Sequence, residues 1–412
     1  MKTDLDRIMQ ENGIDVLLVN GAAAHNPAMV YFTGTCHVSA ADLVRPRGGK
    51  PTLFHFPMER DEAAHTGLQT ASYSQFPIEG LLKETNGNIT EAIALRYKKL
   101  FTSLGIDSGT VAIYGQNEIG ASFAIMNSLQ KLMPAIKFTG FVNDEVLMTA
   151  RMTKDANELD HIRAMGKVTT EVVAKTAEFL TSHKVEKETL VHKDGSPVTI
   201  GEVKNNINLW LAERNAENPE STIFAIGRDA GVPHSAGTPS DPIRLGQTII
   251  FDIYPCEALG GYFYDFTRTW CLGYATDEVL KLYEDVKTVY DKLTSELKVN
   301  APFGDYQKRT CELFEAMGHP TVLSTPQTEI GYCHSLGHGV GLNVHEKPFA
   351  SMINPSPTDN LVPGSVFTLE PGLYYPEKGM GARIEDTLCV TPDGKFEIMA
   401  DFSKDLILPV KS

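Results

Sequence analysis

The fold of this chain is constrained most by two acidic residues that lie inside apolar, strand-like runs. Asp252 lies in TIIFDIYP and Asp265 in YFYDFTRTW, with a glycine-containing turn between the two runs. A hairpin centred between Ala258 and Leu259 would place the two aspartates directly opposite each other, with side chains on one face about 5 Å apart. Two carboxylates at that separation among apolar neighbours cost free energy unless a cation lies between them. The strand pair therefore predicts a cation site.

The same arrangement recurs nearer the C-terminus, where Glu370 lies in FTLEP and Glu385 in ARIED. The two runs flank a loop, so we expect these acids to face each other from neighbouring strands as well. A single acid in a strand is usually a solvated surface residue, and that interpretation applies to each acid taken alone. Two matched pairs instead favour one shared site that holds all the carboxylates.

The stretch HSLGHGVGLNVHE, residues 334 to 346, contains three histidines and three glycines. His334 and His338 have the four-residue spacing of a helical zinc motif. The glycines would cost about 1 kcal/mol each in a helix and the valines prefer extended backbone, so we expect loop and strand. In a strand, the glycines let the backbone around His338 approach a bound group closely. A glycine-rich turn with exposed histidines is the alternative that this stretch alone leaves open.

Carboxylates and one imidazole form an oxygen-rich donor set, which suits Mn, Co, Zn or Fe better than a thiolate zinc site would. Two divalent ions about 3.5 to 4 Å apart need bridging anions, and four carboxylates would neutralise their charge. A water molecule held between two such ions would be acidic enough to act as a nucleophile near neutral pH. The donor set therefore predicts hydrolysis.

The composition limits the compartment and the partners. With 52 acidic against 37 basic residues, the formal charge of −15 argues against nucleic acid as a main partner. The six cysteines are scattered without a C-x-x-C pair, which suggests reduced thiols and a cytoplasmic location. The first apolar run is too short for a signal segment, and no stretch approaches the roughly 20 apolar residues of a membrane span. We expect no membrane partner.

The length of 412 residues predicts two domains. Residues 1–152 alternate helices with short strands such as IDVLLVN and PTLFHF, which predicts an α/β domain. A long helix with a capped start at Asp155 and Glu158 is expected to open the second domain. Helices near 276–297 and 303–317, with strands near 366–371 and 382–390, predict that residues 153–412 are α+β.

FDIYP, GGYFYDFTRTW, HSLGHGVGLNVHE, FTLEPGLY and GARIEDT together resemble the motifs of the pita-bread metallopeptidases, the family of proline dipeptidase, aminopeptidase P and methionine aminopeptidase. The resemblance covers about residues 155 to 412. NPAMVYFTGT and its surroundings resemble the N-terminal domain that proline-specific members share with creatine amidinohydrolase. The resemblance implies a pita-bread catalytic domain that binds two divalent ions, Mn, Co or Zn. The implied ligands are Asp252, Asp265, His338, Glu370 and Glu385, with Asp265 and Glu385 bridging the ions.

The resemblance also assigns roles around the metals. Glu370 would shuttle a proton from the attacking water to the leaving amine. His234, in VPHSAG, and His345, in the V-H-E triplet, match histidines that contact the substrate. Arg383 would meet the site as a fixed cation that orients ligands or holds a substrate carboxylate.

Other polar residues near these motifs have weaker claims. Thr267 and Asp386 are candidates for hydrogen bonds to the ligands, which metal sites usually need. His334 has no role that the resemblance or its chemistry assigns.

The two-domain layout resembles enzymes that cleave small peptides with proline in the second position. Many proline dipeptidases place an arginine shortly after V-H-E, where it pairs with the free carboxylate of the dipeptide, but here only Lys347 follows. Dipeptidase and aminopeptidase therefore both stay open. A metal-independent creatinase-like amidinohydrolase and a non-enzymatic pita-bread binding protein are the rivals, although both kinds lack ligands that this chain keeps. The family often forms homodimers, so we expect one here.

Overall fold

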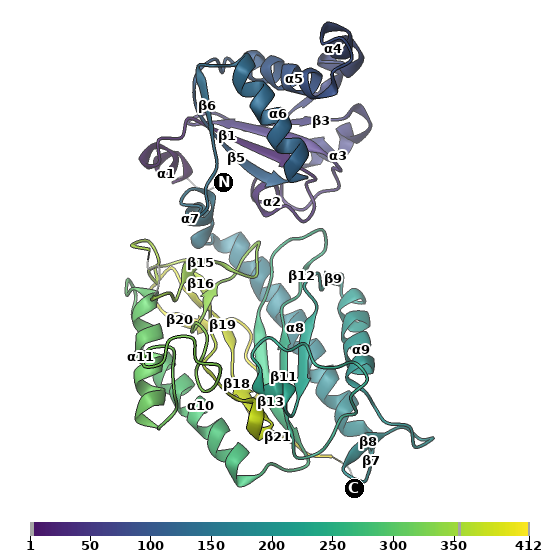
Figure 1. Ribbon diagram of the computed structural model, residues 1–412, viewed down its shortest axis with the longest axis vertical. Coiled ribbons are helices and arrows are strands. Elements are labelled where there is room, and N and C mark those ends of the chain that lie inside the picture. Colours follow the sequence, from purple (N-terminus) through teal and green to yellow (C-terminus); the bar gives the residue numbers. More distant parts are fainter. Residues whose placement is uncertain (1–3, 353–355, 411–412) are drawn as a thin grey trace. The chain divides into compact units, whose positions relative to one another are not determined.

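The computed structural model describes residues 4–352 and 356–410. The chain forms two compact units, one of Met1–Ala150 with Leu259–Gly261 and one of Arg151–Ala258 with Tyr262–Ser412 (Figure 1). The first unit is α/β and the second is α+β, so the predicted fold class is confirmed.

The first unit is built on a six-stranded sheet with the order β4-β3-β2-β1-β5-β6. The strands are β1 (Val16–Gly21), β2 (Ala41–Pro46), β3 (Thr52–His55), β4 (Gln69–Ser72), β5 (Gly109–Gln116) and β6 (Ile136–Thr139). The helices are α1 (Leu5–Glu11), α2 (Pro27–Thr33), α3 (Arg60–His65), α4 (Ile78–Glu84), α5 (Ile89–Ser103) and α6 (Ile119–Leu132). β1 runs parallel to β5 and antiparallel to β2, so the sheet is mixed.

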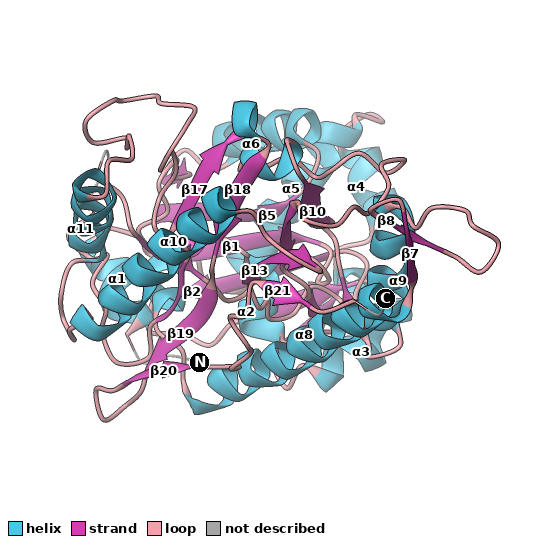
Figure 2. Ribbon diagram, turned by 90° about the horizontal axis from the view of Figure 1, so that it is seen from below, coloured by secondary structure: helices cyan, strands magenta, loops and turns pink. Residues whose placement is uncertain are grey.

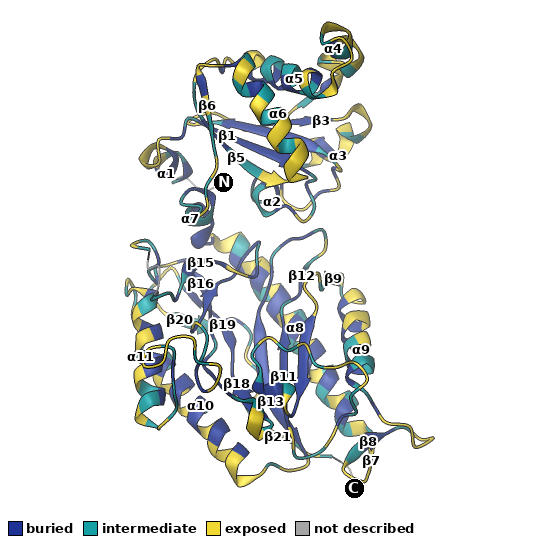
Figure 3. Ribbon diagram, viewed as in Figure 1, coloured by how far each residue is buried: buried dark blue, intermediate teal, exposed yellow. Residues whose placement is uncertain are grey.

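Strand β1 explains why the IDVLLVN run is apolar throughout. Leu17 and Val19 pack into one hydrophobic core, whereas Val16 and Leu18 pack into a second. Because successive side chains of a strand point to opposite faces, β1 contributes to both cores. Figure 3 shows β1 buried along its length, and the predicted strand is confirmed.

The second unit contains two larger sheets, ordered β10-β11-β13-β21 and β15-β14-β16-β19-β20. The first comprises β10 (Thr222–Ile226), β11 (Thr248–Ile253), β13 (Phe266–Leu272) and β21 (Ile407–Leu408). The second comprises β14 (His338–Gly339), β15 (Glu346–Phe349), β16 (Val366–Leu369), β19 (Asp386–Val390) and β20 (Phe396–Ile398). Three strand pairs complete it: β7 (Lys184–Glu186) with β8 (Thr189–Val191), β9 (Ala216–Glu217) with β12 (Cys256–Glu257), and β17 (Gly372–Tyr375) with β18 (Met380–Arg383).

Long helices flank these strands (Figures 1 and 2). They are α8 (Ala156–Ser182), α9 (Ile200–Ala212), α10 (Asp277–Glu296) and α11 (Phe303–Ala316), while α7 (Leu147–Met152) spans the division between the units. The predicted capped start of the long helix is confirmed, because Asp155 and Glu158 form a reciprocal capping box at the first turn of α8. Helices α8 and α9 pack on the sheet of β11 and β13, whereas α10 and α11 pack on the sheet of β16 and β19.

The predicted register of the first acid pair is wrong by two residues. Asp252 pairs with Thr267 across β11 and β13, and Asp265 lies just before the paired residues of β13. The two strands keep one register as far as the Cys256–Phe263 bridge, so the turn is centred between Leu259 and Gly260 instead of between Ala258 and Leu259, and Leu259 adopts a positive φ of 65°. A shift of two residues keeps both side chains on one face, since the side-chain period of a strand is two. The aspartates are therefore diagonal rather than direct neighbours.

The second acid pair follows the expected geometry, although the segment between its members is a β17–β18 hairpin rather than a loop. β16 and β19 pair antiparallel, and their last pair is Leu369 with Asp386. The next residues in that register are Glu370 and Glu385. Both acids therefore leave the strand ends opposite each other.

The glycines around His338 allow close backbone packing. A Cβ on Gly339 would lie 2.0 Å from the carbonyl oxygen of Lys347, and one on Gly337 would lie 2.2 Å from the carbonyl oxygen of Thr368. Only a residue without a side chain fits at either position. The glycines thus hold the short strand β14 tightly between its neighbours.

Across residues 4–352 and 356–410, no helix combines the length and the apolar character needed to cross a bilayer. The six cysteines are free thiols.

A methyl group at position 339 should cost stability. We expect Gly339→Ala to lower the free energy of unfolding by about 1 to 3 kcal/mol, because the backbone of β15 must move to admit the Cβ. Urea denaturation measures the change. Gly80→Ala is the matched control, since a Cβ there meets nothing within 4 Å in helix α4 and alanine favours a helix. Equal stability of Gly339→Ala and the wild type would contradict the close packing of β14.

Candidate metal centre

The second unit contains a cavity of about 710 Å³. It is lined by all eight residues to which the resemblance assigned a role in metal binding or catalysis: His234, Asp252, Asp265, His338, His345, Glu370, Arg383 and Glu385. The five residues with ligand chemistry come from strands or strand ends of both larger sheets. Asp252 lies on β11, Asp265 precedes β13, His338 begins β14, Glu370 follows β16 and Glu385 precedes β19.

The two sheets meet at the centre of this group. Thr267 and Glu385 form an isolated antiparallel bridge, with the Glu385 N–H donating to the Thr267 carbonyl oxygen at 3.1 Å. This bridge joins β13 to the residue before β19. It brings the end of one sheet to the end of the other, where the acids lie.

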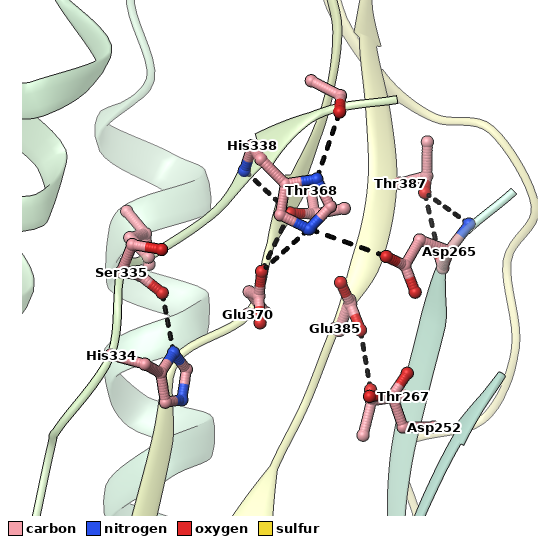
Figure 4. A network of polar contacts seen from close by, with 12 residues as sticks. Asp252, Asp265, Thr267, His334, Ser335, His338, Thr368, Glu370, Glu385 and Thr387 are labelled. Atoms are coloured by element: carbon pink, nitrogen blue, oxygen red, sulfur yellow. Dashed lines mark hydrogen bonds and ion pairs between the residues drawn. The ribbon is translucent and has the colours of Figure 1, made fainter. Parts of the chain in front are cut away.

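His338 and the acids point toward one another in Figure 4. The Nε2 atom of His338 lies 3.4 Å from Glu370 Oε1 and 3.6 Å from Asp265 Oδ2. Asp265, His338 and Glu385 each offer a ligand atom within 4.8 Å of the others, a spacing that could hold a metal ion. Asp252 and Glu370 flank this trio in the same cavity.

Hydrogen bonds fix the orientation of the imidazole. Nδ1 of His338 lies 3.1 Å from the carbonyl oxygen of Gly339, so it carries the proton and leaves the Nε2 lone pair facing the acids. The His338 N–H donates to the Thr368 hydroxyl at 3.1 Å, and that hydroxyl donates to Glu370 Oε1 at 3.2 Å. A backbone carbonyl behind a histidine is the usual support for a metal ligand.

Arg383 balances part of the negative charge. Its guanidinium is 2% exposed and pairs with Asp252 Oδ2, while its Nε donates to the Thr267 hydroxyl at 3.2 Å. Thr267 in turn donates to Glu385 Oε2 at 2.6 Å. The expected hydrogen bond from Thr267 to a candidate ligand is therefore present.

Asp386, the other expected hydrogen-bonding partner, faces away from the cavity. Its carboxylate pairs with Arg268 at 2.7 Å and Lys404 at 2.8 Å, and also accepts from the Tyr290 hydroxyl. Successive residues of a strand point to opposite faces, so Asp386 cannot share the side of Glu385. Its ion pairs stabilise the core behind the site.

Lys347 does not offer a charge to the cavity. It is 5% exposed, and its ammonium donates to Ser356 Oγ at 3.1 Å and Thr358 Oγ1 at 2.8 Å. Among the described residues that line the cavity, Arg383 is a guanidinium and none is a lysine. The Lys347 ammonium group is therefore bound by hydroxyl groups inside the fold and does not face the cavity.

Sequence patterns gave no role to Tyr374 or His334, and the structure links both to Arg383. Nη1 of Arg383 donates to the Tyr374 hydroxyl at 2.7 Å. Nδ1 of His334 lies 2.7 Å from the Ser335 carbonyl oxygen, so the Tyr374 hydroxyl donates to His334 Nε2 at 2.9 Å. Burial, with a smaller effect of Arg383, lowers the pKa of His334 to about 3, which keeps this ring neutral. Tyr374 is the last residue of the FTLEPGLY motif, but neither spacing nor the resemblance assigned it a role.

His345 is exposed in the cavity beside a buried ion triad. Its ring centroid lies 4.2 Å from that of His338. The next residue, Glu346, is 0% exposed and accepts from Lys154 Nζ at 2.6 Å and from Arg151. Burial alone would raise the pKa of Glu346, but Lys154 and Arg151 bring it to about 2. The triad anchors the start of β15, directly after His345.

The donor set fits a cation, and the protonation energetics support that fit. Oδ1 of Asp252 and Oδ1 of Asp265 are buried without a hydrogen-bond partner among the described residues. Burial, with the neighbouring carboxylates, raises the pKa of Asp265 and of Glu385 well above the ordinary range, and burial raises that of Glu370 to about 8. Without a cation, the fold therefore opposes full ionisation of these acids.

A buried centre of carboxylates and one imidazole, set where two sheets meet, defines a metal-dependent enzyme of the hydrolytic class. The sequence comparison makes the class specific. Residues 160–392 match the model of metallopeptidase family M24, more than half of the chain, so the chain belongs to this family. The predicted resemblance to the pita-bread metallopeptidases is confirmed.

Known proteins of several names are similar to this chain. The Xaa-Pro dipeptidase of Pyrococcus furiosus is 25% identical over 401 residues, which are 96% of this chain and 97% of that protein. The Bacillus subtilis protein YkvY is 30% identical over 267 residues, and the match covers 64% of this chain and 65% of YkvY. The X-Pro aminopeptidase structure from Thermotoga maritima has a TM-score of 0.72 at 23% identity, with 98% of each chain covered. That likeness supports the fold of the whole chain, with a pita-bread second unit.

The metal-free protein should lose stability as pH rises. The pKa of Glu370 is about 8 in the fold against 4.5 as its ordinary value, so the folded state binds this proton more tightly than the unfolded state. Its contribution to stability is therefore present below about pH 4.5 and is lost as pH approaches 8. We expect chelated protein to unfold at lower urea concentration at pH 8 than at pH 5.5. Glu370→Gln should reduce this difference.

Added Mn²⁺ should stabilise the folded protein, and this stabilisation should increase with pH, because the ligands release protons when they bind the ion. At 100 times its dissociation constant, an ion that binds only the folded state adds about 2.7 kcal/mol to stability. The same urea series at pH 8 measures the gain. Unchanged unfolding with Mn²⁺, Co²⁺ and Zn²⁺ alike would contradict a metal centre here.

Proposed function

We propose that this chain is a dinuclear metal-dependent peptidase that hydrolyses the peptide bond before proline. The observation that carries the proposal is the cavity itself, where four carboxylates and one imidazole converge and two buried carboxylate oxygens lack partners. The full-length similarity to an enzyme named Xaa-Pro dipeptidase supports the substrate class.

The proposed ligands are Asp252, Asp265, His338, Glu370 and Glu385. Asp265 and Glu385 are proposed as bridges, because both belong to the trio whose ligand atoms lie within 4.8 Å of one another and the Asp265 carboxylate contributes to the raised pKa of Glu385. Two divalent ions would match the four negative charges, and the donor set suits Mn, Co or Zn. Bound there, such ions would polarise a scissile carbonyl group and acidify a water molecule.

Glu370 is the proposed proton carrier. Its side chain is 14% exposed, against 6% for Asp265, so it can meet substrate at the cavity surface. Its raised pKa suits a group that takes a proton and then gives it up. A proline nitrogen in a peptide bond carries no hydrogen, so it must receive a proton as it leaves. Glu370 would deliver that proton.

His234 and His345 are the proposed substrate contacts, because both imidazoles are exposed on the cavity wall. The sequence predicts two alternative roles for Arg383, which are to orient ligands or to hold a substrate carboxylate. Its donors engage Asp252, Thr267, Tyr374 and the Pro233 carbonyl oxygen, and these contacts favour the orienting role. The contact with Pro233 also fixes the backbone next to His234.

The preference between dipeptides and longer peptides is not part of the proposal. Lys347, which is buried away from the cavity, gives no support for a carboxylate clamp at that position. The metal-independent amidinohydrolase and the non-enzymatic binding protein stay as alternatives, and the complete ligand set argues against both. The homodimer stays a prediction, and the free thiols support the proposed cytoplasmic location.

Substrate cleavage tests the proposal directly. We expect the full chain with added Mn²⁺, Co²⁺ or Zn²⁺ to cleave Xaa-Pro dipeptides, longer Xaa-Pro-Yaa peptides, or both, as measured by mass spectrometry. Asp265→Asn should lower the rate by at least about 100-fold, because it removes a bridging charge while the fold is kept. Asp160→Asn, a change of a 76% exposed acid on α8, is the control. Wild-type turnover by Asp265→Asn in metal-replete buffer would refute the ligand assignment.

A further inference from the structure

One carboxylate of the cavity wall is not used by the proposed mechanism. Five carboxylates line the cavity, and four of them form the centre around His338. The fifth, Glu220, is exposed, and no described residue forms an ion pair or a hydrogen bond with its side chain. If two divalent ions neutralise the other four, Glu220 is the negative charge that remains on this wall.

The backbone holds Glu220 in a defined turn. Residues Asn218 to Ser221 form a β-turn in which the Ser221 N–H donates to the Asn218 carbonyl oxygen at 3.3 Å, with Pro219 in the second position. The Asn218 side chain donates to the Thr222 hydroxyl at 2.9 Å, which ties the turn to the start of β10. The carboxylate is therefore presented from a fixed site rather than from a free loop.

Strand pairing relates this turn to the metal centre. Ile223 on β10 pairs with Asp252 on β11, and Glu220 lies three residues earlier in the chain. Three residues of chain span at most about 10 Å, so Glu220 lies beside the centre. Its charge also opposes the lowering of the His345 pKa that burial causes, as expected for neighbours along one wall.

The wall near Glu220 is apolar. Ile223, Tyr254 and Val344 line the cavity there, and the first and last are 6% and 3% exposed. An apolar surface that ends in a carboxylate fits a side chain with a long aliphatic stem and a cationic head. Lysine and arginine have that form.

Substrate geometry decides which part of a peptide can meet Glu220. In an Xaa-Pro peptide, only the α-carbon separates the amino nitrogen from the scissile carbonyl carbon. The α-amino group of a dipeptide must therefore lie near the metal centre whenever the carbonyl does. The side chain of Xaa is free to extend along the wall.

We propose that Glu220 is a specificity-determining residue that selects peptides with lysine or arginine before proline. The inference rests on the proposed function, because it assigns the Xaa side chain to the wall beside β10. Glu220 binds the cationic head of Xaa, and the pair lies partly in solvent, so its effect is moderate and sensitive to salt.

The test compares lysyl-proline with norleucyl-proline, which has a neutral side chain of similar length, on the Mn²⁺-loaded full chain. We expect kcat/KM to be about fivefold higher for lysyl-proline at low salt, as one exposed charge pair about 4 Å apart provides. Glu220→Gln should bring the ratio near one, and Glu220→Lys should invert it while favouring glutamyl-proline. Raising the salt concentration from about 0.01 M to 1 M should reduce the wild-type ratio.

Glu213→Gln, which removes an exposed acid at the end of α9 outside the cavity, is the matched control and should keep the wild-type ratio. A wild-type ratio near one, or the same ratio in Glu220→Gln, would overturn the inference while cleavage itself still supports the proposed function. Absence of cleavage of every Xaa-Pro peptide would overturn both.

Discussion

Mutual repulsion among buried carboxylates is the constraint around which the second unit is organised. Asp265 and Glu385 are 4% and 2% exposed, and burial together with neighbouring carboxylates raises the pKa of each. Burying such charges is costly unless cations or hydrogen bonds compensate. Within the protein the compensation is partial, because Arg383 pairs with Asp252 while Thr267 and Thr368 donate to the two glutamates. The fold is therefore strained electrostatically in a way that a divalent cation relieves.

The location of the centre follows from where strand pairing stops. Backbone groups inside a ladder are occupied by neighbouring strands, and the side chains there are packed in the core. At the last pair of β16 and β19, Glu370 and Glu385 leave the ladder and can turn toward a shared point. The bridge between Thr267 and Glu385 then brings in the end of β13 with Asp265. A residue at the end of a strand is thus held in a defined position by the backbone, while its side chain is not packed in the core as it would be inside the strand.

The sequence indicated which residues gather at the candidate centre more accurately than it indicated how their strands pair. An acid in an apolar strand needs a physical reason, and that requirement identified Asp252 and Asp265 without any knowledge of the turn between them. The register was wrong because the turn is centred one residue later than expected, and the positive φ that Leu259 adopts there cannot be read from spacing. The strands of the other pair, by contrast, continue regularly to Leu369 and Asp386, so Glu370 and Glu385 lie where expected.

The sequence does not show in which direction a long side chain points once the chain has folded. Lys347 and Asp386 lie next to functional motifs, yet both point into the core toward their own partners. Glu220 reaches the cavity from a turn that carries no motif, and Tyr374, the last residue of FTLEPGLY, acts through its hydrogen bond with Arg383. Spacing identifies which residues share a strand face. It does not identify which long side chains reach a site from another element.

The buried triad around Glu346 bears on where the second unit begins. Arg151, near the end of α7, and Lys154, between α7 and α8, both precede the long helix α8 and pair with Glu346. A shortened chain that starts at α8 would leave the Glu346 carboxylate in the interior with no counter-charge, directly beside His345. The lower limit of an autonomous catalytic unit is therefore set by electrostatics at Arg151, ahead of the first residue that packs in its apolar core.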